Sequence, residues 1–146
     1  MKKTIIFLLI FLLINLVGCE PAGQKTFEGE ATTNAKEISQ ELAKKAEKTA
    51  KEVDRVEEAI AVSNEKDVYV HLSVSGFDRL FLKDIRKETK EKLESSNPDG
   101  KVEVSTDKKI ELELTEIKHE LSSREITKKQ LKEDLKKVDD DLKAGG

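Results

Sequence analysis

The sequence predicts an α+β fold: a small α-β-β-α-β(-α) module whose three-stranded mixed sheet is covered by helices on one face. Apolar residues recur at steps of three and four in long charged segments, as in amphipathic helices. In the shorter segments between these, they alternate at every second residue, as in half-buried strands. The chain has no Trp and 39% of its residues are charged, so we expect a small aliphatic core.

The first predicted helix begins near Asn34, and a β-hairpin follows it. The helix carries a narrow apolar stripe made of Ile38, Leu42, Ala46, Thr49, Val53 and Val56. Two alternating segments flank a turn at residues 64–67 and predict antiparallel strands. We expect six residues to face the first helix: Ile60, Val62, Val68, Val70, Leu72 and Val74. The opposite, exposed face then carries Tyr69, His71 and Ser73.

A helix, a strand and a third helix complete the predicted module. The helix starts at Ser75 or Gly76, ends in a turn at residues 97–100 and carries Phe77, Phe81, Ile85, Thr89 and Leu93. Residues 101–105 alternate like a short strand. Thr106 or Asp107 can cap the third helix, which aligns Ile110, Leu114, Ile117 and Leu121. Because a strand-helix-strand connection favours a parallel pair, while a hairpin is antiparallel, we expect a mixed sheet.

Residues 122–146 form a charged tail. The apolar residues Leu131, Leu135, Val138 and Leu142 step by four, three and four, which is too short a repeat to establish a coiled coil. We expect a charged helix that is solvated or loosely packed, and the alternative is a helix that docks on a partner or on a second copy. The acidic run at residues 139–141 lacks the pattern of a calcium loop, so no metal site is expected there.

The N-terminus has the three parts of a secretory signal: Lys2 and Lys3, an apolar run over residues 5–17, and a small residue before Cys19. A transmembrane helix needs about 20 apolar residues, and this run is shorter. The sequence Leu16-Val17-Gly18-Cys19 resembles a bacterial lipobox. That resemblance implies cleavage between Gly18 and Cys19, and covalent diacylglycerol and N-acyl lipid on Cys19. We therefore expect a signal peptide at 1–18, a flexible tether at 19–34 and a protein that its lipid holds on the extracytoplasmic face of the cell membrane.

The sequence shows no catalytic equipment. The scattered glycines form no phosphate-binding loop, and His71 and His119 have no thiol or further imidazole to complete a zinc set. Serines that could lie beside His71 lack an acidic residue to orient the imidazole. We therefore expect no enzyme, no catalytic residue, no metal and no cofactor other than the lipid on Cys19. Mixed charges with a net charge of -3 also disfavour a nucleic-acid partner.

Two strand motifs carry a family resemblance. The blocks KDVYVHLSV at residues 66–74 and KVEVSTD at 101–107, together with the lipobox and the helix order, resemble the YhcN/YlaJ family of sporulation lipoproteins. The resemblance covers residues 35–121, and His71 and Glu103 depart from the family's pattern. It implies a non-catalytic lipoprotein of endospore-forming bacteria that acts in sporulation or germination at the cell or spore membrane.

We therefore expect a membrane-anchored module with a structural or interaction role. Its partner is an unidentified envelope or spore protein, or a second copy of itself. The expected partner surface on the exposed face of the sheet comprises Tyr69, His71, Ser73, Lys101 and Glu103. One alternative is a carrier of a small ligand or lipid, with a cavity lined by the core residues Ile60, Val70, Leu72, Phe81 and Ile85. Another is a subunit of a ring-forming envelope assembly, which rests on fold-level analogy.

Overall fold

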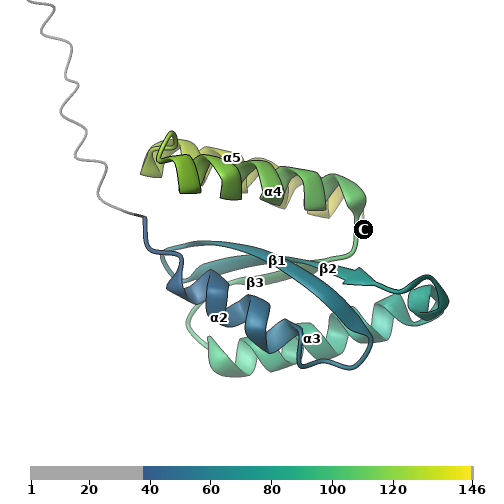
Figure 1. The fold of residues 1–146 in the computed structure, drawn as a ribbon. Helices are drawn as coiled ribbons and strands as arrows, with labels where there is room; N and C mark the ends of the chain where they lie inside the picture. Colours follow the sequence, from purple (N-terminus) through teal and green to yellow (C-terminus); the bar gives the residue numbers. More distant parts are fainter. Residues whose placement is uncertain (1–37, 146) are drawn as a thin grey trace, which may run out of the picture. The chain divides into compact units, whose positions relative to one another are not determined.

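A three-stranded sheet lies between two layers of helices in the computed structural model, which describes residues 38–145 (Figure 1). The strands, in the spatial order β1-β2-β3, are β1 (Val56–Asn64), β2 (Asp67–Val74) and β3 (Val102–Ser105). β1 and β2 are antiparallel, whereas β2 and β3 are parallel. The helices are α2 (Glu41–Ala50), α3 (Leu82–Ser96), α4 (Lys108–Ser123) and α5 (Lys128–Ala144), with a 3₁₀ helix η1 (Gly76–Phe81) before α3. This order and the mixed sheet confirm the predicted fold class.

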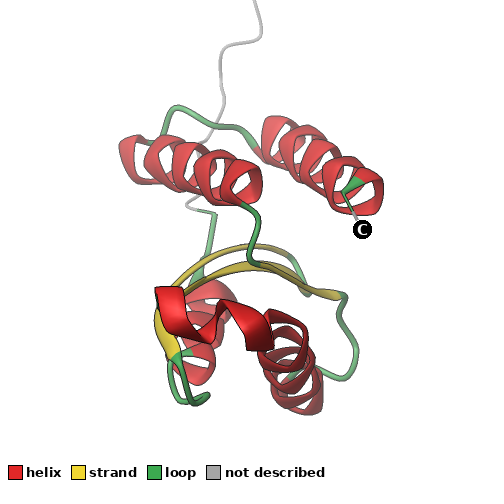
Figure 2. Ribbon diagram, turned by 90° about the vertical axis from the view of Figure 1, so that its right-hand side faces the viewer, coloured by secondary structure: helices red, strands yellow, loops and turns green. Residues whose placement is uncertain are grey.

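Helices cover both faces of the sheet, and not one face only as expected from the sequence. Figure 2 shows α2 and α3 on one side of the strands, with α4 and α5 on the other. The strands carry buried apolar side chains on both faces, with Val70 and Leu72 on one and Val62 and Tyr69 on the other, so each face needs its own layer of helices. Each face of the sheet has its own apolar cluster, and the domain is therefore a three-layer α/β/α arrangement.

The layer of α2 and α3 packs through small side chains. α2 begins at Glu41 with Gln40 as its N-cap, later than expected, and the expected cap Asn34 lies outside the described residues. Three alanines of α2 are buried against the sheet: Ala43, Ala46 and Ala50. From β2, the residues that alternate toward them are Val68, Val70 and Leu72, as predicted. Because alanine is short, α2 can lie close to the strands.

β1 presents the opposite set of side chains from the one expected. Ala59 and Ala61 belong to the cluster with α2, whereas Ile60 and Val62 belong to the cluster with α4 and α5. The reason is the register: β1 and β2 join through a two-residue turn, which places Val62 opposite Tyr69 and Ala61 opposite Val70. Directly opposed residues share one face of a sheet, so Ile60 and Val62 cannot lie on the face of Val70.

The C-terminal segment is part of the folded core and not a solvated tail. α5 buries Leu131, Leu135 and Val138, in one cluster with Leu114 and Ile117 of α4. A capping box between Thr127 and Gln130 fixes the start of α5, and Asp107 caps α4 as predicted. The expected boundary at residue 121 is therefore wrong, because residues on both sides of it fill the same apolar cluster.

The outer edge of β1 is closed by side chains of α2 and its N-cap. The backbone N–H of Ser63 donates to Oε1 of Gln40 at 2.9 Å, and the Gln40 amide donates to the carbonyl of Ser63 at 2.8 Å. The N–H of Ala61 donates to Oε1 of Glu47 at 2.9 Å. Glu47 also pairs with Lys118 of α4, so one carboxylate connects both helical layers around the strand.

Candidate functional site

The predicted lipobox, Leu16, Val17, Gly18 and Cys19, lies outside the described residues, as do the predicted signal peptide at 1–18 and the predicted tether at 19–34. Among residues 38–145, no helix has the length and apolar character needed to cross a membrane. Any site among the described residues therefore belongs to the folded domain.

The partner surface expected on the sheet is covered. Tyr69 and His71 are 7% and 2% exposed, because α4 and α5 lie over this face of the sheet. Ser73, Lys101 and Glu103 are half-buried. The expectation was wrong because it left the C-terminal helix in solvent, whereas Tyr69, His71, Lys101 and Glu103 form contacts inside the domain.

Three of these residues meet at the start of β3. Nζ of Lys101 lies 5.6 Å from the centroid of the Tyr69 ring and 3.4 Å from Oε1 of Glu103. Lys101 also pairs with Asp139 of α5, and Glu103 lies 3.4 Å from Nζ of Lys90 on α3. The cluster therefore connects the sheet to a helix of each layer, and its charges are paired within the molecule.

Burial and pairing shift the pKa values in this cluster. Burial raises the pKa of Tyr69, against the effect of the nearby Lys101 ammonium. Burial alone would lower the pKa of Lys101, but the hydrogen bond with Asp139 and the neighbouring Tyr69 and Glu103 raise it. Hydrogen bonds from Lys101 and Lys143 lower the pKa of Asp139. The charged forms of Lys101 and Asp139 thus stabilise each other, which is what a structural ion pair requires.

His71 lies deeper, beneath the first turns of α4. Its Nε2 is 3.7 Å from Oε2 of Glu111, and its Nδ1 is buried without a hydrogen-bond partner. Burial lowers the pKa of His71, and the carboxylate of Glu111 opposes that shift. Glu111 in turn receives a hydrogen bond from Lys108 at 2.6 Å, which lowers its own pKa. His71 is therefore a buried histidine with Glu111 as its ionic partner.

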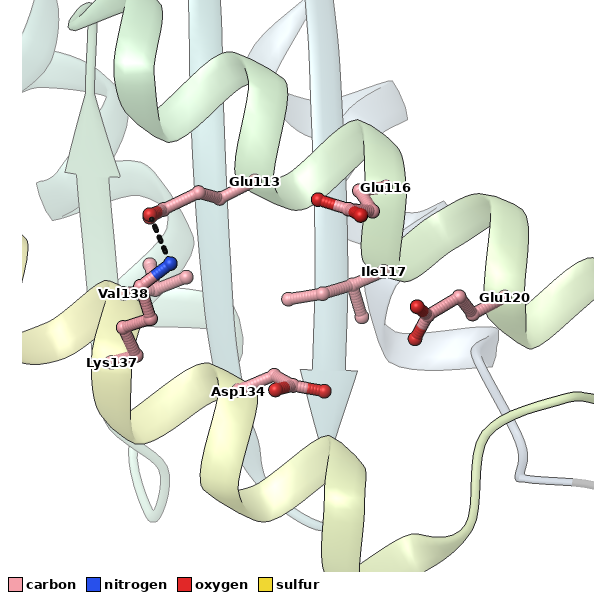
Figure 3. A pocket seen from close by; sticks show the side chains of 7 residues that line it. All are labelled: Glu113, Glu116, Ile117, Glu120, Asp134, Lys137 and Val138. Atoms are coloured by element: carbon pink, nitrogen blue, oxygen red, sulfur yellow. Dashed lines mark ion pairs between the residues drawn. The ribbon is translucent and has the colours of Figure 1, made fainter.

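A small acidic pocket lies between α4 and α5 on the outer side of the domain (Figure 3). Its volume is about 140 Å³, and Ile117 and Val138 are its apolar lining. The polar lining comprises Glu113, Glu116, Glu120, Asp134 and Lys137. Lys137 pairs with Glu113 at 3.1 Å, which raises the pKa of Lys137. In the described part of the chain, no group of three or more His, Cys, Asp or Glu side chains is placed to hold a metal ion.

The exposed feature that sequence reasoning missed is an apolar ridge on η1, defined here as Phe77, Leu80 and Phe81. Phe77 is 95% exposed, Leu80 is 91% exposed and Phe81 is 42% exposed. From the sequence, Phe77 and Phe81 were expected on the buried stripe of a helix. In the structure the helix proper begins only at Leu82, and η1 lies beyond the end of β2 (Figure 1), where no strand covers it. The later stripe residues Ile85, Thr89 and Leu93 are buried as predicted.

The ridge stands on a segment that the rest of the domain holds in place. The guanidinium of Arg55 lies 4.3 Å from the centroid of the Phe81 ring, and Nε of Arg55 is 3.6 Å from Asp78. Ser75 Oγ donates to Asp78 at 2.5 Å, and the N–H of Asp78 donates to the carbonyl of Ser75. These contacts order the backbone under Phe77 and Leu80 and leave both side chains in water. Large exposed apolar side chains that lie together often mark an interaction site.

Comparison of the chain with protein-family models, with curated proteins and with solved structures gave no match.

Proposed function

We propose that the protein is a bacterial lipoprotein, anchored through Cys19 to the extracytoplasmic face of the cell membrane, with a non-catalytic structural or interaction role. The observation that carries this proposal is the sequence Leu16-Val17-Gly18-Cys19 at the end of an apolar run. Two acyl chains are enough for stable anchoring. The lipid would then set the location of the protein, and the folded domain would supply its contacts.

The surface of the domain supports an interaction role. The apolar ridge projects three side chains from an ordered segment, so it is available to another component of the envelope. The charged groups around Lys101 and His71 connect the helices to the sheet, which favours a structural role for them. The ridge therefore replaces the covered sheet face as the proposed contact surface.

The carrier alternative receives less support from the domain. Of the five residues expected to line its cavity, Val70, Leu72 and Ile85 belong to one packed cluster, whereas Ile60 lies at the cluster on the other face and Phe81 is 42% exposed. The pocket between α4 and α5 is lined by other residues and has a volume of only about 140 Å³, well below the several hundred Å³ of ordinary ligand sites. A role in sporulation or germination rests on the two strand motifs at 66–74 and 101–107.

Replacement of the anchor residue tests the proposal. The variant Cys19→Ser should fail to incorporate labelled fatty acid and should accumulate as an unprocessed or soluble product, because Cys19 is the only cysteine of the chain. The matched control is Thr32→Ser in the same N-terminal region, which should label like the natural chain. Equal labelling of the Cys19→Ser variant would refute the anchor. Constant abundance before and during sporulation would refute the proposed stage of action.

A further inference from the structure

We propose that the apolar ridge inserts into the surface of an anionic lipid bilayer, so that the domain contacts the membrane directly as well as through its lipid. This inference rests on the proposed function, because the anchor is what keeps the domain close to a bilayer. It deepens that function by naming the component of the envelope that the ridge contacts.

The shape of the ridge fits a fluid apolar layer. Phe77 and Leu80 are each more than 90% exposed and stand on a six-residue helix that projects past the end of the sheet. A stable protein interface buries about 800 Å² on each partner, over some 20–30 residues, whereas the ridge offers three apolar side chains. A small projecting tip can enter lipid without a complementary cavity, since acyl chains rearrange around it.

The charge around the ridge also favours an anionic surface. Residues 75–88 hold four basic side chains, Arg79, Lys83, Arg86 and Lys87, and three acidic ones, Asp78, Asp84 and Glu88. Asp78 is already bonded to Ser75 and lies beside Arg55. The whole chain carries a net charge of -3, whereas this segment carries +1, and Arg79 and Lys83, the basic residues next to the ridge, are exposed. Basic residues close to the surface are attracted by anionic headgroups, and they would lie at the depth of those headgroups when the tip is inserted.

A second copy of the chain is a less favourable occupant. A two-fold contact through the ridge would gather Arg79 and Lys83 of both copies in one small interface. Like charges placed close together across an interface oppose association. The bilayer meets the same basic residues with charges of the opposite sign.

The chain is long enough for both attachments to reach one membrane. Gln40 is bonded to Ser63 at the hairpin end of β1, whereas η1 follows Val74, which pairs with Val56 at the other end. A strand of nine residues spans about 30 Å. The 18 residues between Cys19 and Ile38 span at most about 60 Å when extended. The ridge and the anchor can therefore hold the domain at opposite ends of its sheet, which would restrict its orientation.

A single tryptophan can report the insertion, because the natural chain contains none. The full chain carrying Phe77→Trp is reconstituted in vesicles of phosphatidylethanolamine and phosphatidylglycerol, with and without brominated acyl chains. In the vesicles we expect the tryptophan fluorescence to shift to shorter wavelength, and we expect the brominated lipid to quench it. Leu80→Trp is a second reporter on the ridge. The control is Leu112→Trp on α4, at a residue that is 61% exposed and outside the ridge, and it should show neither change.

The outcomes separate the ridge from the anchor. If the tryptophan fluorescence of the Phe77→Trp and Leu80→Trp variants is neither shifted nor quenched, as in the Leu112→Trp control, the ridge inference is overturned. This holds even if Cys19 carries labelled lipid. Absence of lipid on Cys19 in protein purified from cells would refute the anchor, while quenching of the same protein by brominated lipid would leave the ridge inference standing. In the Phe77→Trp chain, the added changes Arg79→Gln and Lys83→Gln should weaken quenching. A photo-crosslinker at position 77 that couples in cells to a protein, and not to lipid, would also overturn the inference.

Discussion

The two faces of the sheet are packed in different ways. Toward α2 and α3, the sheet and α2 bring together alanines and valines, with Ala46 and Ala61 as examples. Toward α4 and α5, the contacts include large aliphatic side chains such as Leu114 and Leu131. Among the described residues, the two buried titratable side chains, Tyr69 and His71, lie on this second face. Packing on the first face depends on the close approach of α2 to the strands. Packing on the second face depends on large side chains and on paired charges.

Because of this difference, the two helical layers should respond to different perturbations. A larger side chain should disturb the face of α2, because no space exists between closely packed elements. Loss of a large side chain should disturb either face, since Leu72 and Leu131 are both buried, whereas a change of pH should disturb the face of α4 and α5. A variant on one face, compared with a matched variant elsewhere, separates the two responses.

The largest expected effects come from core leucines on the two faces. Leu131→Ala on α5 and Leu72→Ala on β2 should each lower the free energy of unfolding by about 2–5 kcal/mol, because both side chains are at most 1% exposed. Unfolding in urea measures both. The control Leu112→Ala should change the value by less than about 0.5 kcal/mol. A comparably small effect of Leu131→Ala alone would show that α5 does not contribute to the core.

A smaller effect is expected from enlarging an alanine of α2. Ala46→Leu should lower the free energy of unfolding by about 1–3 kcal/mol, since the added methyl groups meet a packed surface. Ala46 is 3% exposed. Lys45→Leu, which introduces the same side chain on the exposed side of the helix, should have little effect in the same urea titration. Equal stability of the two variants would contradict close packing between α2 and the sheet.

The smallest expected effect at neutral pH concerns His71, whose contribution depends on pH. Burial lowers its pKa in the folded protein, while the unfolded chain titrates near 6.5. Below that pH the unfolded state binds a proton that the folded state does not, so stability should fall as the pH drops from about 6.5 toward the folded pKa. The carboxylates of Glu111 and Asp139, whose pKa values are lowered, lose their contribution only in more acidic solution.

Urea unfolding at several pH values between about 7 and 5 checks this expectation. The variant His71→Gln should lose the decrease in stability over that range. His119→Gln, at an exposed position on α4, should keep it. A decrease that persists unchanged in the His71→Gln variant would assign the pH dependence to other groups.

The sequence allowed the element types and the mixed sheet to be predicted, because period and turn residues are local signals. The side of β1 that faces α2 was predicted wrongly, although the turn at residues 64–67 was correct. The β1 segment AIAV is apolar at every position, so alternation alone does not decide whether Ala61 or Val62 faces α2. The two-residue turn decides this, since it places Val62 opposite Tyr69 and therefore on the face away from α2.

The interaction surface was harder to predict than the fold. Phe77 and Phe81 continue the four-residue steps of α3, so the pattern assigned them to the core. Their exposure depends on where the sheet ends and on the 3₁₀ geometry of η1, which are non-local facts. Likewise, the burial of Tyr69 and His71 depends on α5 folding back onto α4 and the sheet, and two short repeats of apolar residues could not establish that contact.

The contacts of Gln40 and Glu47 with the edge of β1 have a consequence for assembly. A free strand edge is a template on which another chain can add a strand. At this edge the outward N–H groups of Ala61 and Ser63 are already bonded within the molecule. A protein concentrated on the two-dimensional surface of a membrane, as proposed here, is thereby protected from edge-to-edge polymerisation through β1.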